Sequence, residues 1–139
     1  VTIQAQILEL IGRLKRETGA SVMLITHDLG VIAEAAEHVA VIYTGQVVEY
    51  ASVEGRYATP LHPYSVGLME SIPKIDVAGA RHEHLNVIPG MVPSLYNLPQ
   101  GCTFQDRCPR TMKICREKEP QLWEHLPGHK VHCWLYEQK

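Results

Sequence analysis

The chain has 139 residues, of which 45% are hydrophobic and 20% are charged, and its formal net charge at pH 7 is −2. This length suffices for a domain with a hydrophobic core, and the near-neutral charge disfavours the basic surface of a nucleic-acid-binding protein. No apolar run approaches the roughly 20 residues of a membrane-spanning helix, so we expect a soluble protein without a signal peptide.

The first part of the chain predicts two helices separated by a buried strand. Apolar residues recur at helical spacing over residues 2–18, and Gly19 follows as the expected C-cap. The apolar run Ser21–Thr26 predicts a strand of a parallel sheet that is covered on both faces. Asp28 is the expected N-cap of a short helix over Leu29–Glu37.

The middle of the chain predicts a hairpin, a helix and a long loop. Two β-rich runs, His38–Tyr43 and Gln46–Tyr50, flank the turn residues Thr44-Gly45. Pro63–Ser71 predicts a helix, and Lys74–Gln100 predicts extended, loop-like chain. We expect a domain boundary near Pro73, the missing strands of the sheet upstream of Val1, and a separate small unit formed by the last 40 residues.

The polar end of the first predicted strand is a candidate ligand site. Leu24–Gly30 changes from apolar to polar at Thr26, and ligands of open α/β sheets bind at the carboxyl ends of strands. His27 can donate a hydrogen bond to a phosphate or position a water molecule. The alternative is a strand-end histidine that only caps the next helix or faces solvent.

The carboxyl-terminal part contains all four cysteines, Cys102, Cys108, Cys115 and Cys133, in the pattern C-x5-C-x6-C-x17-C. Four thiolates can bind zinc or an iron–sulfur cluster. The short knuckles of zinc ribbons, in which adjacent amides bond the sulfurs, are absent, and the wide gaps favour a cluster over zinc. Two disulfides or four free thiols are the alternatives. His129 and His132 are further candidates because they lie close to Cys133.

Several segments resemble the ATP-binding subunits of ABC importers for dipeptides and oligopeptides. Val1–Ile7 is similar to the helix after the D-loop of that family, Leu24–Gly30 to its switch-histidine loop, and His38–Gly45 with Val47–Glu49 to the following hairpin. The peptide and nickel branch of the family is further indicated by motifs at residues 61–64, 71–73, 88–90, 93–95 and 98–102. The phosphate-binding loop, the magnesium-binding and catalytic carboxylates, and the ABC signature have no counterpart in these residues.

The resemblance implies an α/β fold that is the C-terminal fragment of a P-loop NTPase (ABC ATPase) domain. Residues 1–73 would be the last part of that domain, and residues 74–139 would be an oligopeptide/dipeptide transporter C-terminal domain. His27 would be the switch histidine that contacts the γ-phosphate and its attacking water. A [4Fe-4S] cluster would be bound by Cys102, Cys108, Cys115 and Cys133, with zinc as the alternative. The cluster would have a structural or redox-sensing role.

The resemblance also implies the function and the partners. The parent protein would be a peptide-transporter ATPase that uses ATP and Mg²⁺, whereas this part alone would be inactive. Its partners would be a second ATP-binding subunit, two membrane permease subunits and a solute-binding protein, at the inner face of the cytoplasmic membrane. The alternative function is a metal-binding structural or interaction module. Self-association through the apolar edge at Val22–Ile25 is a further expectation.

Overall fold

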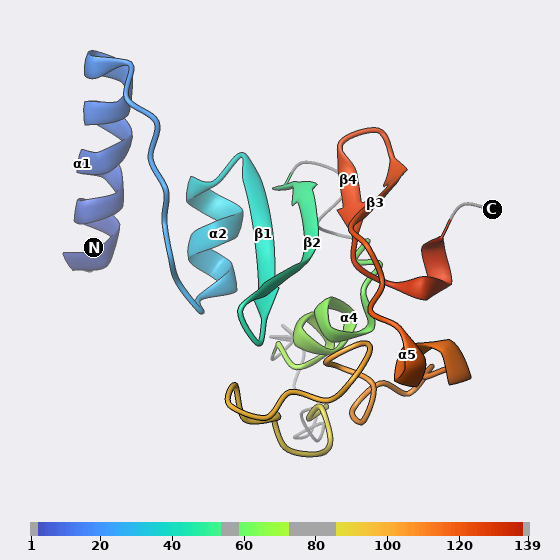
Figure 1. The fold of residues 1–139 in the computed structure, drawn as a ribbon. Coiled ribbons are helices and arrows are strands. Elements are labelled where there is room, and N and C mark those ends of the chain that lie inside the picture. Colours follow the sequence, from blue (N-terminus) through green and yellow to red (C-terminus); the bar gives the residue numbers. More distant parts are fainter. Residues whose placement is uncertain (1–2, 54–58, 73–85, 138–139) are drawn as a thin grey trace, which may run out of the picture. The chain divides into compact units, whose positions relative to one another are not determined.

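The fold is described from a computed structural model, which defines residues 3–53, 59–72 and 86–137 (Figure 1). The chain divides into two compact units, unit 1 over residues 1–37 and unit 2 over residues 38–139. Both helices and strands are present, as expected for a small α/β protein. None of the described helices is both long and apolar enough to cross a membrane.

Unit 1 contains two helices whose ends confirm the predicted caps. Helix α1 spans Ile3–Thr18 and ends at Gly19, which has a φ of 68° and donates its N–H to the Lys15 carbonyl at 3.0 Å. Helix α2 spans Leu29–Ala35, and the Asp28 carboxylate accepts two backbone N–H groups of its first turn at 2.9 and 3.2 Å. The Asp28 bonds satisfy N–H donors that a helix leaves unpaired at its start, and the Gly19 bond satisfies a carbonyl that α1 leaves unpaired at its end.

The strand predicted over Ser21–Thr26 is not formed, and that prediction is wrong for this structure. The segment has no regular secondary structure, and the side chains of Met23 and Ile25 are 88% and 91% exposed. A strand requires neighbouring backbone groups to pair with, and no strand of the described residues pairs with this segment. Its apolar side chains therefore have no sheet to enter.

Unit 2 is built on a four-stranded antiparallel sheet in the order β1-β2-β4-β3 (Figure 1). Strands β1 (His38–Tyr43) and β2 (Gln46–Ser52) form the predicted hairpin. Its turn residues Thr44 and Gly45 have φ values of 47° and 81°. Two successive positive φ angles match the type I′ turn, whose twist suits a two-residue hairpin.

The two remaining strands come from the cysteine-bearing end of the chain. Strand β3 spans Trp123–Leu126 and β4 spans His129–Val131. Strand β4 pairs with β2 through Glu49 opposite Val131, so the hairpin and the carboxyl-terminal part share one sheet. The boundary expected near Pro73 falls outside the described residues, and the division into residues 1–73 and 74–139 stays a prediction.

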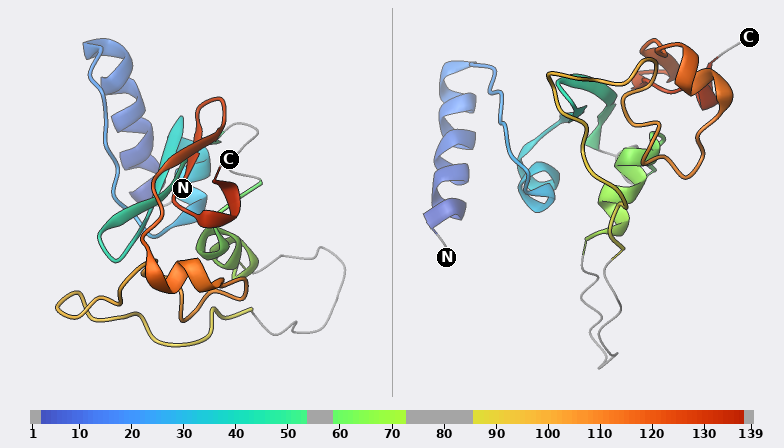
Figure 2. Two further views of the ribbon diagram at one scale, coloured as in Figure 1. Left: turned by 45° about the vertical axis from the view of Figure 1, so that its right-hand side comes forward. Right: turned by 60° about the horizontal axis from the view of Figure 1, so that its bottom comes forward.

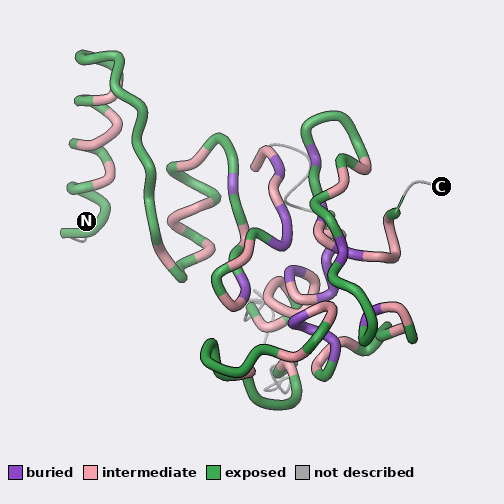
Figure 3. Tube along the Cα trace, in the orientation of Figure 1, coloured by how far each residue is buried: buried purple, intermediate pink, exposed green. Residues whose placement is uncertain are grey.

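The core of unit 2 lies where the sheet meets a helix and a turn-rich segment. Helix α4 spans Pro63–Glu70, which confirms the helix predicted there, whereas residues 86–100 have no regular structure, as expected. Tyr43, Val48 and Phe104 form the buried centre. Figure 3 colours the buried parts of the chain purple. Tyr64 of α4 packs on Phe104 with ring centroids 5.5 Å apart. In both views of Figure 2, α4 (green) lies beside the turn-rich segment (orange) that follows residue 100.

Two short helices complete unit 2. Helix α5 spans Lys113–Glu117, and the 3₁₀-helix η1 spans Trp134–Tyr136 directly after Cys133. Helix α5 carries Cys115, and η1 follows Cys133. The indole N–H of Trp134 donates to the Lys118 carbonyl at 2.9 Å. This bond ties η1 to the end of α5.

Candidate functional site

His27 lies on an exposed bend between the irregular segment and α2. The residues on both sides of it are fixed, because the Thr26 hydroxyl accepts the Asp28 N–H at 3.0 Å and Asp28 caps α2. The imidazole is therefore presented to solvent from a defined loop. Its role toward a phosphate stays a prediction.

The four cysteines converge from three parts of unit 2. All four are free thiols, with Cys115 and Cys133 buried and Cys102 and Cys108 half-buried. The Cys102 N–H donates to the Cys115 carbonyl at 2.8 Å. Gly101 permits this contact, because a Cβ there would lie 2.3 Å from that carbonyl oxygen and its φ is 80°. Cys115 is carried by α5, and Cys133 follows β4.

Backbone amides bond the sulfurs, although the sequence pattern lacks short knuckles. The donors are Phe104 and Gln105 for Cys102, Arg110 for Cys108, Met112 for Cys115, and Leu135 for Cys133. Such bonds therefore form here without C-x2-4-C spacing. The turn over residues 103–107, the turn at 109–110 and the first turns of α5 and η1 supply the amides instead. N–H groups directed at sulfur stabilise thiolates and metal-bound sulfur.

Burial opposes ionisation of three of these thiols. It raises the pKa of Cys102 and of Cys133 to about 11, and it also raises the pKa of Cys108. The negative charges of the other thiolates raise these pKa values further, whereas the backbone N–H bonds lower them. The thiols are thus close enough to influence one another, and a cation between them would relieve the opposition to ionisation.

The thiols are nevertheless not arranged around a single ion. In the part of the chain that the structure describes, no three Cys, His, Asp or Glu side chains are grouped so as to hold a metal ion. A tetrahedral zinc site has zinc–sulfur distances of about 2.3 Å, and hence sulfurs about 3.8 Å apart. The geometry therefore gives no direct support to the predicted metal site.

A buried carboxylate on β2 forms a second polar cluster. The side chain of Glu49 is 5% exposed and accepts the Leu61 N–H at 2.8 Å and the His62 N–H at 3.0 Å. Its Oε1 also lies 2.6 Å from Nε2 of His129, whose side chain is fully buried. A buried carboxylate is tolerated when hydrogen-bond donors surround it. Glu49 thereby joins β2, β4 and the chain entering α4.

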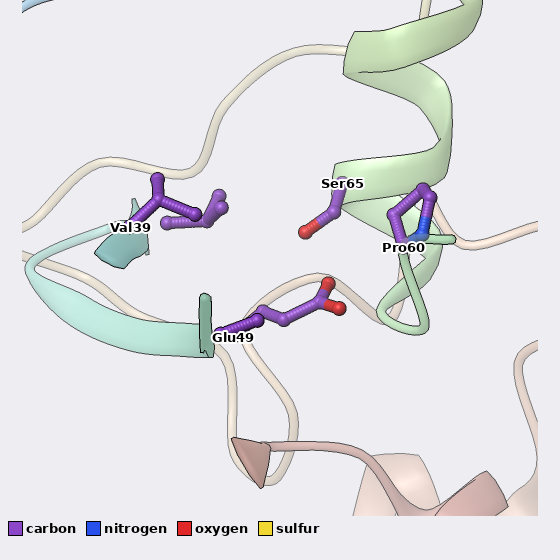
Figure 4. Close-up of a pocket in the computed structure, with 6 residues that line it drawn as sticks. Val39, Glu49, Pro60 and Ser65 are labelled. Atoms are coloured by element: carbon purple, nitrogen blue, oxygen red, sulfur yellow. The ribbon is translucent and has the colours of Figure 1, made fainter. Parts of the chain in front are cut away.

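His62 is part of the same cluster and starts α4. Its Nδ1 accepts the Tyr64 N–H at 3.1 Å, so the ring serves as the N-cap of the helix. Burial lowers the pKa of His62 to about 4, although the charge of Glu49 acts in the opposite direction. Figure 4 shows the Glu49 carboxylate and the Ser65 hydroxyl on either side of a cavity of about 10 Å³. Burial therefore keeps His62 neutral at physiological pH.

Sequence reasoning missed this cluster. The sequence pattern assigns Glu49 only to the hairpin and assigns His62 only to a family motif at residues 61–64. The signal was available, because a glutamate within the otherwise apolar β2 sequence must find partners if the strand is buried. His129 was a candidate because of its proximity to Cys133, yet it binds Glu49, while Nε2 of His132 lies 3.7 Å from Oε1 of Glu119.

Comparison with known proteins shows that the chain is similar to ATP-binding proteins of peptide transport. Residues 48–115 match the family model described as the oligopeptide/dipeptide transporter, C-terminal region. Over 139 residues the chain is 50% identical to the oligopeptide transport ATP-binding protein AppD of Bacillus subtilis (strain 168) and 45% identical to the dipeptide transport ATP-binding protein DppD of the same organism. Over 134 residues it is 43% identical to the oligopeptide transport ATP-binding protein OppD of Escherichia coli (strain K12).

These matches cover nearly all of the chain but less than half of each relative. They extend over 100%, 100% and 96% of the chain, and over 42%, 41% and 39% of the three relatives. The chain is therefore similar over nearly its whole length to oligopeptide and dipeptide transport ATP-binding proteins, and it spans about two fifths of their length.

Proposed function

We propose that the chain is the carboxyl-terminal part of the ATP-binding and ATP-hydrolysing subunit of an ABC importer for peptides. The observation that carries this proposal is the identity of 43–50% to three peptide transport ATP-binding proteins over at least 96% of the chain. The match of residues 48–115 to the transporter C-terminal region supports the same assignment. The alternative of a scaffold that only binds metal lacks comparable support.

His27 is the residue of this chain that we assign to the ATPase reaction. Attack of water on a γ-phosphate requires in-line positioning and stabilisation of charge on the phosphoryl oxygens. An exposed imidazole on a loop fixed by Asp28 can donate a hydrogen bond to such an oxygen and orient the water. ATP and Mg²⁺ would be held chiefly by residues outside this chain, since its 139 residues contain no G-x-x-x-x-G-K-[ST] motif.

The test of this assignment uses the longer protein that contains both this chain and the phosphate-binding loop. His27→Ala is expected to lower kcat about 100-fold or more, because it removes a group that acts on the reacting phosphate and water. ATP binding should change little. His38→Gln, at an exposed histidine that starts β1, is the matched control and should retain turnover. Wild-type turnover in His27→Ala would remove His27 from the mechanism.

The proposed function implies an assembly at the membrane. A second ATP-binding subunit, two permease subunits and a solute-binding protein would complete the importer, with this subunit at the inner face of the cytoplasmic membrane. The 139-residue chain alone is expected to show no ATP turnover. ATP hydrolysis that co-purifies with the chain and is abolished by a substitution in the chain would contradict this expectation.

The four cysteines are proposed as the ligands of a [4Fe-4S] cluster, with zinc as the alternative. The donor set supports this, since four free thiols influence one another electrostatically and each sulfur accepts a backbone N–H. Such a group would cross-link residues 101–108, α5 and the end of β4, and it would be able to accept an electron.

Anaerobic purification tests the cluster directly. The chain should then be brown and contain about four iron and four sulfide per chain. Cys102→Ser should lose most of the iron, whereas Thr111→Ser, at an exposed position in the same part of the chain, should retain it. Stoichiometric zinc in protein produced with ample iron would contradict the cluster and support the alternative.

A further inference from the structure

A hollow of about 530 Å³ opens in unit 2 between α4, the segment 86–90 and the turn around Arg107. Volumes of about 300–1,000 Å³ are usual for small-molecule sites. Among the described residues, Cys108 is the one cysteine on its wall, so the hollow differs from the space between the four thiols. Neither the proposed ATPase chemistry nor the proposed cluster uses it.

The apolar part of this hollow is formed in advance of any ligand. Leu61, Val66, Ile88 and Phe104 contribute to its wall, and Phe104 is 1% exposed. Ile88 is seated against α4 at Gly67, where a Cβ would lie only 2.7 Å from its Cγ1. The wall is therefore held by close packing, and a bound apolar group would not have to order it.

Two guanidinium groups give the hollow a cationic end. Arg107 donates to the carbonyls of Ile88 and Pro89, both at 3.0 Å, and lies 6.0 Å from the centres of two aromatic rings. The side chain of Arg110 is hydrogen-bonded to Tyr136. These contacts are to neutral groups, and within the described residues neither arginine forms a salt bridge. Arg107 already donates from Nε and from both terminal nitrogens, to Pro89, Ile88 and the Tyr43 hydroxyl, so it contributes mainly its charge. Arg110 is the guanidinium with N–H groups to offer a carboxylate.

The acidic residues of the wall are not equivalent to each other. The carboxylate of Asp106 lies 3.4 Å from the Arg116 guanidinium, which partly neutralises it. Glu70 is exposed and is the last residue of α4. It lies about 10 Å along the helix axis from Pro63, the first residue of α4. The hollow thus offers arginines for a carboxylate, an acidic residue for an ammonium group, and an apolar wall for a side chain.

We propose that this hollow binds a short peptide with free termini, its carboxylate at Arg107 and Arg110, its ammonium group at Glu70 and its side chains on the apolar wall. The choice of a peptide among small zwitterions rests on the proposed function. The binding itself depends only on unit 2 and requires no nucleotide.

Calorimetric titration of the chain with the dipeptide Ala-Phe tests the proposal. The free dipeptide should bind, and its C-terminal amide should bind about tenfold more weakly, because it lacks the carboxylate. Arg110→Gln should weaken binding of the free dipeptide by a similar factor. Lys113→Gln is the matched control, since it removes the same charge from α5 outside the hollow. Circular dichroism checks that both variants fold.

A second variant separates the two ends of the ligand. Glu70→Gln should weaken binding of Ala-Phe but leave binding of its N-acetyl derivative unchanged. No binding of Ala-Phe up to about 10 mM, or equal affinity for the amide, would overturn the proposal. Unchanged affinity in a folded Arg110→Gln variant would overturn it as well. Because the titration contains no ATP, its failure leaves the ATPase assignment intact, and a failed His27 test leaves peptide binding intact.

Discussion

Replacement of Glu49 by glutamine should destabilise unit 2 substantially although it changes few atoms. The carboxylate receives two donors at Oε1, the Leu61 N–H at 2.8 Å and Nε2 of His129 at 2.6 Å, and the His62 N–H at Oε2 at 3.0 Å. A glutamine has one oxygen and one NH₂ group. If the oxygen retains the two donors at the Oε1 side, the NH₂ group must face the His62 N–H.

The magnitude follows from the burial of these groups. Glu49 and His62 are 4% and 1% exposed, so water does not replace a lost acceptor. A buried donor left without a partner costs about 1–3 kcal/mol, and the remaining bonds lose the strengthening that a charged acceptor provides. We expect Glu49→Gln to lower the free energy of unfolding by about 3 kcal/mol. Glu137→Gln, at an exposed site, should change it by less than about 0.5 kcal/mol.

Urea unfolding followed by tryptophan fluorescence measures this difference. The two tryptophans, Trp123 in β3 and Trp134 in η1, both lie in the carboxyl-terminal part that Glu49 ties to β2. The two variants carry the same change of charge, so the comparison isolates the buried contacts. If Glu49→Gln unfolds at the same urea concentration as Glu137→Gln, the carboxylate does not hold these segments together.

Three further changes test other parts of the argument. The pKa of His62 is lowered from 6.5 to about 4 in the folded chain, so the unfolded chain binds a proton first as the pH decreases. The free energy of unfolding should therefore fall by up to about 3 kcal/mol between pH 7 and pH 4. His62→Asn, which can still cap α4, should flatten this pH dependence in urea titrations. Gly101→Ala should destabilise the chain more than Gly45→Ala in thermal unfolding. Both glycines have φ near 80°, but only at Gly101 would a Cβ lie 2.3 Å from the Cys115 carbonyl oxygen. Equal losses of thermal stability would show that backbone strain alone matters. Asp28→Ala should lower helicity in circular dichroism and cost about 1 kcal/mol, and an unchanged spectrum would refute its capping role.

Signals that act over a few residues predicted the structure well. Gly19, Asp28 and Thr44-Gly45 each end, start or connect an element where the sequence places them, because capping and turn conformations depend on the residue itself. The start of α4 at Pro63 follows the same logic, since proline favours the first turn of a helix.

Signals that depend on distant partners did not. The apolar run Ser21–Thr26 has the composition of a buried strand, but a strand forms only where other backbone groups can pair with it. The short strands β3 and β4 were not anticipated, because runs of four and three residues have almost no periodicity. Their positions follow from pairing with β2, which no local pattern encodes.

The register of β4 connects the buried carboxylate to the cysteines. His129, Val131 and Cys133 are buried, whereas Lys130 between them is exposed, so the three alternate residues face inward together. A shift of one residue in a strand exchanges its two faces. The bond between Glu49 and His129 fixes this register, and the His132 N–H adds a bond to the Val48 carbonyl at 2.8 Å. Glu49 thereby places the thiol of Cys133 among the other three, which makes the four-cysteine arrangement depend on a residue that is distant from all of them in sequence.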